Sequence, residues 1–323
     1  MKNRVATIIL TPFSWVYGLI TGLRNLLYDR SILNSYRPEI PVIVVGNLIA
    51  GGTGKTPMVA WIARELSEKY RVAILSRGYG RRTRGFLFLD ADSTPETVGD
   101  EPMELRLLLT EIPIAVDRKR KRGIQNLTSG KYGKIDLILM DDGFQHRRVT
   151  PGYAIILDDF NRPMRREKLL PAGLLREPLS GLKRADLIIE TKKQISFDSR
   201  QASSCIILIT GISNHQPLAD EVSKTGFLCR HLKYSDHHRY THADAASIRN
   251  LYFSLLPENQ LSAAPSAPLL LTTGKDYVKL SRLPELSDLP LQWIPIGPPI
   301  NPDQKQEILN KIYHYVEKIN GNN

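Results

Sequence analysis

The sequence predicts an α/β protein built from two domains, with an apolar helix ahead of them. Three observations support this: runs of β-branched residues that resemble strands, helical stretches that alternate with these runs, and a polar interruption near residue 195. The runs are continuously apolar, as is typical of buried parallel strands. We expect a helix within residues 1–35, a core domain over residues 36–195 and a smaller α/β domain over residues 196–323.

The first expected element is the N-terminal helix. Residues Val5–Leu23 carry no charge, whereas basic residues flank them on both sides. Their length approaches that of a membrane span, but Pro12, Ser14 and several glycines and threonines dilute the run. Trp15 and Tyr17 suit the headgroup boundary of a bilayer. We therefore predict a helix that lies in a membrane surface, and the alternative is a helix packed on the protein's own core.

The core domain is expected to begin after Pro38. Its predicted strands are Val42–Gly46, Val72–Leu75, Phe86–Leu89, Ile114–Val116, Asp136–Met140, Ala154–Leu157 and Leu187–Glu190. Its predicted helices include Thr56–Lys69 and Glu101–Leu109. Strands that alternate with helices favour a parallel sheet covered on both faces.

The second domain is expected to follow a polar stretch at Lys192–Gln201. Its predicted strands are Cys205–Gly211, Gly226–Lys233, Leu269–Thr272 and Trp293–Ile296, and residues Ser262–Pro268 read as a surface loop. The chain's only cysteines, Cys205 and Cys229, fall in strand-like stretches. Their small number argues against a disulfide scaffold and fits a reducing cytoplasm.

A glycine-rich loop joins the first predicted core strand to a helix. It reads Gly46-Asn-Leu-Ile-Ala-Gly-Gly-Thr-Gly-Lys-Thr56, and this order of strand, loop and helix is typical of a P-loop NTPase-like core. Backbone N–H groups of the loop would close on phosphate oxygens, and we assign this role to Gly51, Gly52, Thr53, Gly54, Lys55 and Thr56. Lys55 would act on the β- and γ-phosphates, and the Thr56 hydroxyl would hold Mg²⁺.

The loop departs from the strict P-loop pattern at one position. Ile49 stands where a glycine five residues before Gly54 is usual. A glycine-rich turn without a ligand is the plain alternative, but the complete Gly-Gly-Thr-Gly-Lys-Thr run after a strand favours phosphate binding.

A P-loop requires an acidic partner for its metal at the end of a neighbouring strand. The strand Asp136–Met140 leads into Asp141-Asp142-Gly143, which supplies such a pair. We predict that Asp141 and Asp142 hold Mg²⁺ or its water. By itself the same tripeptide would more often be a simple turn.

Several phrases along the chain resemble one enzyme family. GNLIAGGTGKTP, SRGYGR, VGDEP, DDGFQH, LLPAGLLREP, SDHHRY and TTGKDYVKL look like the tetraacyldisaccharide 4'-kinases, in the family's order and over roughly Pro41 to Leu280. The resemblance implies an ATP-dependent kinase that phosphorylates the 4'-hydroxyl of a tetraacyldisaccharide 1-phosphate, a lipid A precursor. It also implies a location at the cytoplasmic face of the bacterial inner membrane.

The resemblance implies roles for several side chains. Asp100 and His237, rather than His238, would form a dyad that serves the acceptor hydroxyl, and Glu177 would lie near the metal. Arg77, Arg118 and Arg176 would bind phosphates of the substrate or nucleotide. Read locally, Asp100 is only a favourable acid at a helix start and the two histidines belong to a solvated loop. The chain also carries Gly274 where the family usually has glutamate.

The net charge of +11 indicates an anionic partner, and three functions could supply one. The kinase interpretation expects ATP, Mg²⁺, a glycolipid substrate and an anionic membrane surface, with a monomeric chain, no nucleic acid and a second domain that closes over the active site. The runner-up is a membrane-associated P-loop ATPase or GTPase switch without a lipid acceptor. A nucleic-acid-binding NTPase would rest on charge alone, because the basic runs lack interleaved aromatic residues.

Overall fold

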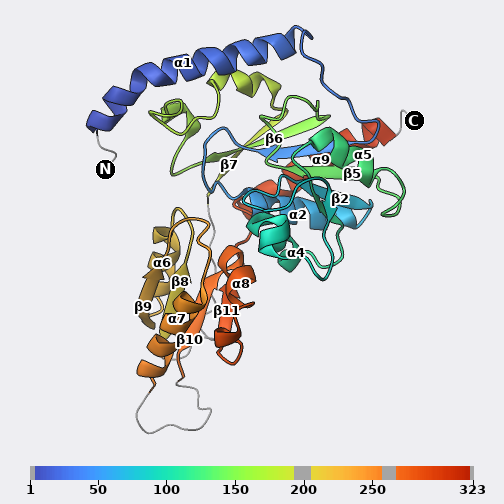
Figure 1. Ribbon diagram of the computed structural model, residues 1–323. Helices are drawn as coiled ribbons and strands as arrows, with labels where there is room; N and C mark the ends of the chain where they lie inside the picture. The colour runs from blue at the N-terminus through green and yellow to red at the C-terminus, as the bar shows by residue number, and fades with distance from the viewer. Residues whose placement is uncertain (1–3, 193–204, 257–266, 321–323) are drawn as a thin grey trace.

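The computed structural model describes residues 4–192, 205–256 and 267–320, and within them it forms two separate sheets (Figure 1). The larger sheet has the strand order β3-β4-β2-β5-β1-β6-β7, and the smaller has the order β11-β10-β8-β9. We call each sheet with the helices that cover it the large unit and the small unit.

The large unit is parallel except at one edge, where β3 runs antiparallel to β4. Its strands are β1 (Val42–Gly46), β2 (Val72–Ser76), β3 (Leu87–Phe88), β4 (Ile114–Val116), β5 (Leu137–Asp141), β6 (Tyr153–Asp159) and β7 (Leu187–Thr191). Its helices include α2 (Lys55–Ser67), α3 (Pro95–Val98), α4 (Asp100–Leu108), α5 (Arg120–Leu127) and two short 3₁₀ helices, η1 (Met164–Arg166) and η2 (Leu179–Arg184). Each predicted strand is therefore present within one or two residues.

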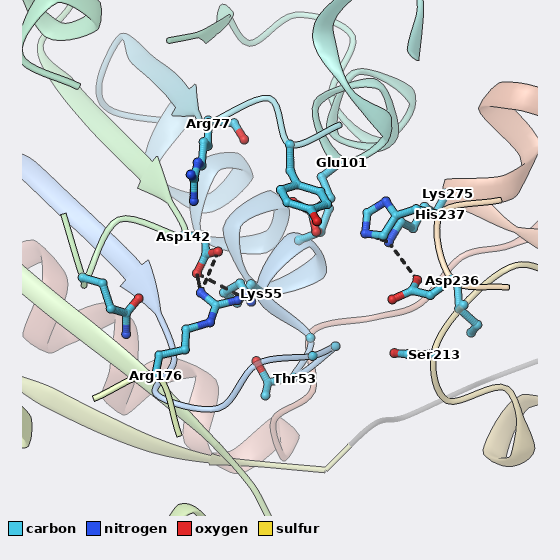
Figure 2. Close-up of a pocket in the computed structure, with 18 of the residues that line it drawn as sticks. Thr53, Lys55, Arg77, Glu101, Asp142, Arg176, Ser213, Asp236, His237 and Lys275 are labelled. Atoms are coloured by element: carbon cyan, nitrogen blue, oxygen red, sulfur yellow. Dashed lines mark hydrogen bonds and ion pairs between the residues drawn. The ribbon is translucent and has the colours of Figure 1, made fainter. Parts of the chain in front are cut away.

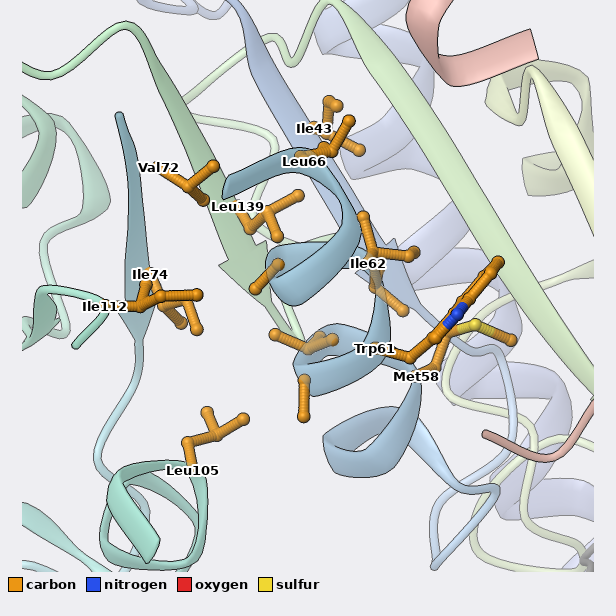
Figure 3. Close-up of a cluster of buried hydrophobic side chains, with 14 of the residues drawn as sticks. Ile43, Met58, Trp61, Ile62, Leu66, Val72, Ile74, Leu105, Ile112 and Leu139 are labelled. Carbon is orange, nitrogen blue, oxygen red and sulfur yellow. The ribbon is translucent and has the colours of Figure 1, made fainter. Parts of the chain in front are cut away.

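Both faces of the large sheet are buried, which explains why its strands are continuously apolar. On one face Ile43, Ile74 and Leu139 pack against Met58 and Ile62 of α2, and this cluster also includes Leu105 of α4 (Figure 3). On the other face, alternate residues of the same strands pack against α5 and against the segments that follow β5 and β6. The sheet thus forms the middle layer of a three-layer core.

The small unit repeats this arrangement on a smaller scale. Its strands are β8 (Ile206–Thr210), β9 (Leu228–Lys233), β10 (Leu269–Thr273) and β11 (Leu291–Ile294), all parallel. Helix α6 (Gln216–Ser223) packs on one face and α7 (His242–Ser254) on the other, while α8 (Gly274–Leu280) and η4 (Pro284–Leu286) follow β10. Strand β11 begins and ends two residues before the predicted Trp293–Ile296.

The last helix, α9 (Pro302–Asn320), packs on the large sheet although it lies in the range expected for the second domain. Ile308, Ile312 and Val316 join the core cluster that contains α2, and the ring of Tyr315 stacks on Tyr153 of β6. The chain therefore leaves the large unit after β7 and returns to it after β11. The expected boundary at Lys192–Gln201 lies outside the described residues except for Lys192.

The two cysteines were expected to argue against a disulfide scaffold, but they are paired in the structure. Cys205 and Cys229 form a disulfide, with their Cα atoms 5.4 Å apart. The cause is local, because β8 and β9 are neighbours in the small sheet and the two residues lie beside each other there. The sequence could not show this pairing, since the two strands had no assigned order. The predicted loop Ser262–Pro268 lies largely outside the described residues.

Helix α1 (Arg4–Asp29) lies along one side of the large unit (Figure 1). One face is anchored: the Ser14 hydroxyl donates to the Leu169 carbonyl at 3.0 Å, and the Tyr17 hydroxyl donates to the Arg176 carbonyl at 2.7 Å. The other face is apolar and exposed, with Trp15 72% and Leu19 73% exposed. The helix is long and apolar enough to enter a membrane, and this exposure contradicts the alternative of a core helix.

Candidate active site

The phosphate loop connects β1 to α2 and has a backbone shape that suits anion binding. Gly51 and Gly54 adopt φ values of 127° and 84°, in the left-handed region that favours glycine. The side-chain amide of Asn47 donates to the Thr53 hydroxyl at 2.8 Å. The Lys55 ammonium donates to Oδ1 of the same side chain at 3.4 Å. Helix α2 begins at Lys55, so its N-terminal dipole end faces the loop.

Ile49 has a structural role that explains the departure from the strict loop pattern. Its side chain is only 4% exposed and joins the core cluster that contains Val44 and Leu175. Ile49 also forms a β-bridge with Leu175, and the neighbouring Ala50 N–H donates to the Leu174 carbonyl at 2.8 Å. The first half of the loop is therefore fixed to the 169–176 segment, and the glycines needed for phosphate lie in the second half.

Two carboxylates stand at the end of β5, directly beside the phosphate loop. Asp141 is 1% exposed; its Oδ2 accepts from the Ser76 hydroxyl at 3.3 Å, and its Oδ1 has no hydrogen-bond partner among the described residues. Burial raises the pKa of Asp141 well above its ordinary value, and the charges of Glu101 and Asp142 add to this. A buried carboxylate in this state is suited to a cation.

The second carboxylate, Asp142, is already paired with two cations. Its oxygens accept from Arg176 Nη1 at 2.9 Å, and Oδ1 lies 3.7 Å from Lys55 Nζ (Figure 2). Burial raises the pKa of Asp142, but Lys55 and Arg176 outweigh this and hold it below its ordinary value. Arg120 is buried underneath and donates to the Asp141 carbonyl at 2.9 Å. This guanidinium fixes the backbone of the acidic pair.

The donor set at this point fits Mg²⁺. The ion prefers one or two carboxylates together with substrate phosphates, rather than a cage made wholly of protein. The unpartnered Oδ1 of buried Asp141 is such a donor, and Thr56 and Asp142 line the cavity. Within residues 4–192, 205–256 and 267–320, no group of three or more His, Cys, Asp or Glu side chains is arranged to hold a metal.

Glu177, predicted to lie near the metal, has other partners. It is 2% exposed, forms an ion pair with Arg184 and accepts from the Asn25 amide of α1 at 2.8 Å. Both contacts use Oε2, so this oxygen links α1 to η2. Glu177 Oε1 has no hydrogen-bond partner among the described residues and Glu177 lines the cavity, so its place near the metal stays a prediction.

Asp100 and His237 meet although 137 residues separate them in the chain. Asp100 is the first residue of α4 in the large unit, and His237 follows β9 in the small unit; Asp100 Oδ2 lies 3.2 Å from His237 Nδ1. Burial raises the pKa of Asp100, but the hydrogen bond from His237 and the charges of Lys279 and Lys275 outweigh it, so the pKa is lowered. Asp100 is thus a stable carboxylate that orients the ring.

The neighbouring His238 points elsewhere. Its Nε2 lies 3.1 Å from Asp244 Oδ2 in the first turn of α7. His237 itself adopts φ of 58°, and its N–H donates to the Gly211 carbonyl at 3.1 Å. This backbone turn directs one histidine of the pair into the cavity and the other into the small unit.

The phosphate loop, Asp142, Glu177 and His237 border one cavity of about 870 Å³ between the two units. Figure 2 shows His237, Lys275 and Asp236 on one side and Lys55, Asp142 and Arg176 on the other. Arg77 and Arg118 also line the cavity, as predicted for groups that would contact phosphates. Tyr17, Thr21, Arg24 and Asn25 of α1 form part of the wall, so the cavity reaches the apolar helix.

Glu104 lies close to the glycine at position 274. The Glu104 carboxyl lines the cavity, and a Cβ placed on Gly274 would lie 3.0 Å from Glu104 Oε1. Burial raises the pKa of Glu104 to about 7, partly offset by Lys275. A carboxyl from α4 therefore occupies the space beside the start of α8.

Sequence reasoning missed several residues of the site. Arg120 lies in a basic run that reads as solvated surface, yet among the described residues it is one of the largest fully buried side chains. Lys275 and Lys279 belong to the TTGKDYVKL phrase, but nothing in that phrase shows that they approach His237 and Asp100. Their partners lie on distant segments, so only the tertiary structure could identify them.

Comparison with known proteins decides between the functions that such a site could serve. The profile of the tetraacyldisaccharide-1-P 4'-kinase family matches residues 6–204 and 197–314. This chain belongs to that family. Tetraacyldisaccharide 4'-kinase from Parabacteroides distasonis is 36% identical, with 88% of this chain and 86% of that one covered. The enzyme of the same name from Flavobacterium johnsoniae is 35% identical, with 84% and 87% covered.

A solved structure of a family member agrees with the fold. LpxK from Aquifex aeolicus, crystallised in complex with ATP, superposes with a TM-score of 0.75 over 96% of this chain and 99% of that chain, at 26% identity. The tetraacyldisaccharide 4'-kinase family thus confirms the predicted α/β fold and the predicted ATP-dependent kinase of lipid A biosynthesis. Nothing in these comparisons supports the ATPase or GTPase switch.

Proposed function

We propose that the cavity between the two units transfers the γ-phosphoryl group of ATP to the 4'-hydroxyl of a tetraacyldisaccharide 1-phosphate. The observation that carries this is that the phosphate loop, Asp142 and His237 line one cavity, with Asp141 next to Asp142 in the chain and Asp100 hydrogen-bonded to His237. An enzyme that only hydrolysed nucleotide would not need an Asp–His pair opposite the phosphate loop, because it has no acceptor hydroxyl to activate.

The phosphate side of the reaction falls to the large unit. The N–H groups of residues Gly51 to Thr56 would bind the phosphates, and Lys55 would act on the charge that develops at the γ-phosphoryl group. Thr56, Asp141 and Asp142 would hold Mg²⁺, with Glu177 near it, and the ion would neutralise phosphate charge when bound. Asp142 keeps Lys55 and Arg176 directed at this point, at 3.7 Å and 2.9 Å.

The acceptor side falls to both units. With the Nδ1 proton donated to Asp100, Nε2 of His237 is the ring atom with a lone pair, and it accepts from Lys275 Nζ at 2.9 Å. The acceptor hydroxyl would take the place of this Lys275 contact at Nε2. The 4'-hydroxyl would lose its proton to this pair while its oxygen bonds to the γ-phosphorus and the bond to the β-phosphate oxygen breaks, leaving ADP. A sugar hydroxyl is a weak nucleophile, so this assistance contributes to the rate.

The lipid substrate would enter from the membrane beside α1. The exposed apolar face of the helix would lie in the surface of the cytoplasmic leaflet, whose anionic lipids attract the basic chain. Arg77, Arg118 and Arg176 would meet phosphate groups of the glycolipid or nucleotide. We take the working enzyme to be a monomer that does not bind nucleic acid, with the kinase core at 36–195 and a smaller domain from 196 that closes over the site.

A labelling experiment tests this function. ATP carrying label in the γ-phosphate is incubated with the protein, Mg²⁺ and vesicles that contain tetraacyldisaccharide 1-phosphate, and the products are separated by thin-layer chromatography. We expect the label on the lipid. Label found only as free phosphate would instead indicate the nucleotide-hydrolysing switch.

A further inference from the structure

Lys279 is a buried lysine that contacts the Asp100–His237 pair from behind. Its side chain is 7% exposed, and Nζ lies 3.3 Å from Asp100 Oδ2, the same oxygen that contacts His237. Nζ also lies 3.3 Å from Asp276 Oδ1 and donates to the His238 carbonyl at 3.0 Å. A buried ammonium group needs such partners, because its charge is otherwise costly to remove from water.

The position of Lys279 is set within the small unit. Its partner Asp276 is 0% exposed and accepts from the Gly211 N–H and the Thr273 hydroxyl, both at 2.8 Å. Gly211 in turn accepts the N–H of His237. One network of the small unit therefore holds both Lys279 and His237, in addition to their contacts with Asp100.

Asp100 comes from the other side of the junction. It begins α4 of the large unit, and α4 packs against α8, which carries Lys279. The small unit thus presents two donors to a single carboxylate oxygen: His237 Nδ1 at 3.2 Å and Lys279 Nζ at 3.3 Å. A half-buried carboxylate with only one donor would turn towards water or bind a proton more readily.

We propose that Lys279 is a positioning residue that binds Asp100 and so assembles the pair across the two units. This inference rests on the proposed catalytic role of Asp100 and His237. Lys279 does not touch the reacting atoms; it holds Asp100 ionised and at the distance at which it orients the imidazole ring. The effect of Lys279 on kcat should therefore depend on the Asp100 carboxylate. It should disappear in a variant that lacks this carboxylate.

A simpler role would be to hold the two units together, and the chain offers a matched control for it. Arg282, just beyond α8, donates to the Ser93 carbonyl of the large unit at 3.3 Å. It is also a cation of the small unit that reaches across the junction, but it contacts neither Asp100 nor His237 in the described residues. Arg282→Met removes a contact between the two units and leaves Asp100 and His237 unchanged.

The test measures lipid phosphorylation by the full-length chain. Lys279→Gln keeps a donor for Asp276 and the His238 carbonyl but removes the charge, and Lys279→Arg keeps the charge. We expect Lys279→Gln to lower kcat by about 10–100-fold, a part of the 10²–10⁴-fold typical of general-base assistance. The KM for ATP should stay within about twofold, Lys279→Arg should recover part of the loss, and Arg282→Met should retain kcat within about threefold.

A double-mutant cycle decides the matter. In an Asp100→Asn background, Lys279→Gln should cost less than about threefold, because it acts through the carboxylate that is gone. An equal loss in both backgrounds, or the same loss in Arg282→Met, would overturn the inference in favour of docking. Should Lys279→Gln fail to fold, as judged by circular dichroism, the same cycle with Lys279→Met, which also removes the charge, applies the same criterion.

The two proposals fail in different ways. If Asp100→Asn lowers kcat but neither Lys279 variant does, the pair is catalytic and Lys279 does not position it. If Asp100→Asn keeps full activity, the pair itself has no catalytic role, and the inference about Lys279 falls with it.

Discussion

At the scale of single residues, Lys55 connects the phosphate loop to the acidic pair. Its ammonium group lies 3.4 Å from Asn47 Oδ1 and 3.7 Å from Asp142 Oδ1, and its side chain is 9% exposed. These contacts hold the charge in one direction before any phosphate binds, so little reorganisation accompanies the reaction. Preorganised charge of this kind acts mainly on the transition state.

Lys55→Ala should therefore lower kcat for lipid phosphorylation by about 10²–10³-fold, the usual effect of removing one such contact. Steady-state kinetics with saturating lipid measure this. Arg64→Ala is the matched control, since Arg64 is an exposed cation on the same helix and contacts the Leu108 carbonyl at 3.0 Å. If Lys55→Ala retained more than about a tenth of the wild-type rate, the loop would not be the phosphate site.

At the scale of elements, α1 shows how one helix serves two surroundings. Ser14 and Tyr17 fasten it to the 169–176 segment, which also holds the phosphate loop through Ile49 and Ala50. The opposite face carries exposed apolar side chains that contact no core cluster. A membrane-bound α1 would thus place the cavity wall next to the lipid.

Trp15→Ser together with Leu19→Ser should weaken binding to anionic vesicles, because burial of each such side chain is worth about 1.5–3 kcal/mol. Co-sedimentation measures the bound fraction, and we expect at least a tenfold weaker partition with unchanged ATP affinity. Phe253→Ser is the control, because Phe253 is 47% exposed on α7 of the small unit. Unchanged sedimentation of the double variant would mean that α1 does not bind the membrane by this face.

His231 of strand β9 should make the stability of the fold depend on pH. Burial lowers the pKa of His231 from 6.5 to about 4, and its Nε2 lies 2.9 Å from the Thr210 hydroxyl. Between pH 6.5 and about 4, His231 binds a proton in the unfolded chain but not in the folded chain. The free energy of unfolding therefore falls as the pH falls through this range.

His231→Asn should therefore reduce the loss of Tm between pH 7 and pH 5, by an amount on the order of 2 °C. Differential scanning calorimetry at the two pH values measures it. His314→Asn, a change at an exposed position of α9, should leave the difference as in the wild type. An equally large loss of Tm in His231→Asn and wild type would contradict the assignment.

At the scale of the whole molecule, local patterns and distant pairings differ in how far the sequence reveals them. Strands such as β1 and β5 could be predicted because buried parallel strands are continuously apolar, and the phosphate loop could be predicted because its function lies within eleven adjacent residues. The edge strand β3 was expected, but not its antiparallel direction, because two residues carry no directional signal.

Contacts between distant segments could not be predicted from the sequence. The apolar face of α9 is equally compatible with either sheet, and only the fold shows that it packs on β6 and α2. The 179 residues between Asp100 and Lys279 hide their pairing in the same way. The resemblance to a family pointed to Asp100 and His237. The structure supports His237 over His238, because His237 contacts Asp100 whereas His238 contacts Asp244.

The central claim is that Asp100 of the large unit and His237 of the small unit act as one catalytic group on an acceptor hydroxyl. The measurement that tests it most directly is kcat for lipid phosphorylation in Asp100→Asn, His237→Ala and the double variant, with His238→Ala as control. Each single change should lower kcat by about 10²–10⁴-fold with ATP affinity nearly unchanged, and the double variant should lose little more than the worse single. Asp100 lies in the first turn of α4, after the N-cap Gly99, and its side chain makes no cap hydrogen bond within the described residues. Full activity of Asp100→Asn would therefore leave Asp100 no catalytic role, and strictly multiplicative losses would show two independent residues.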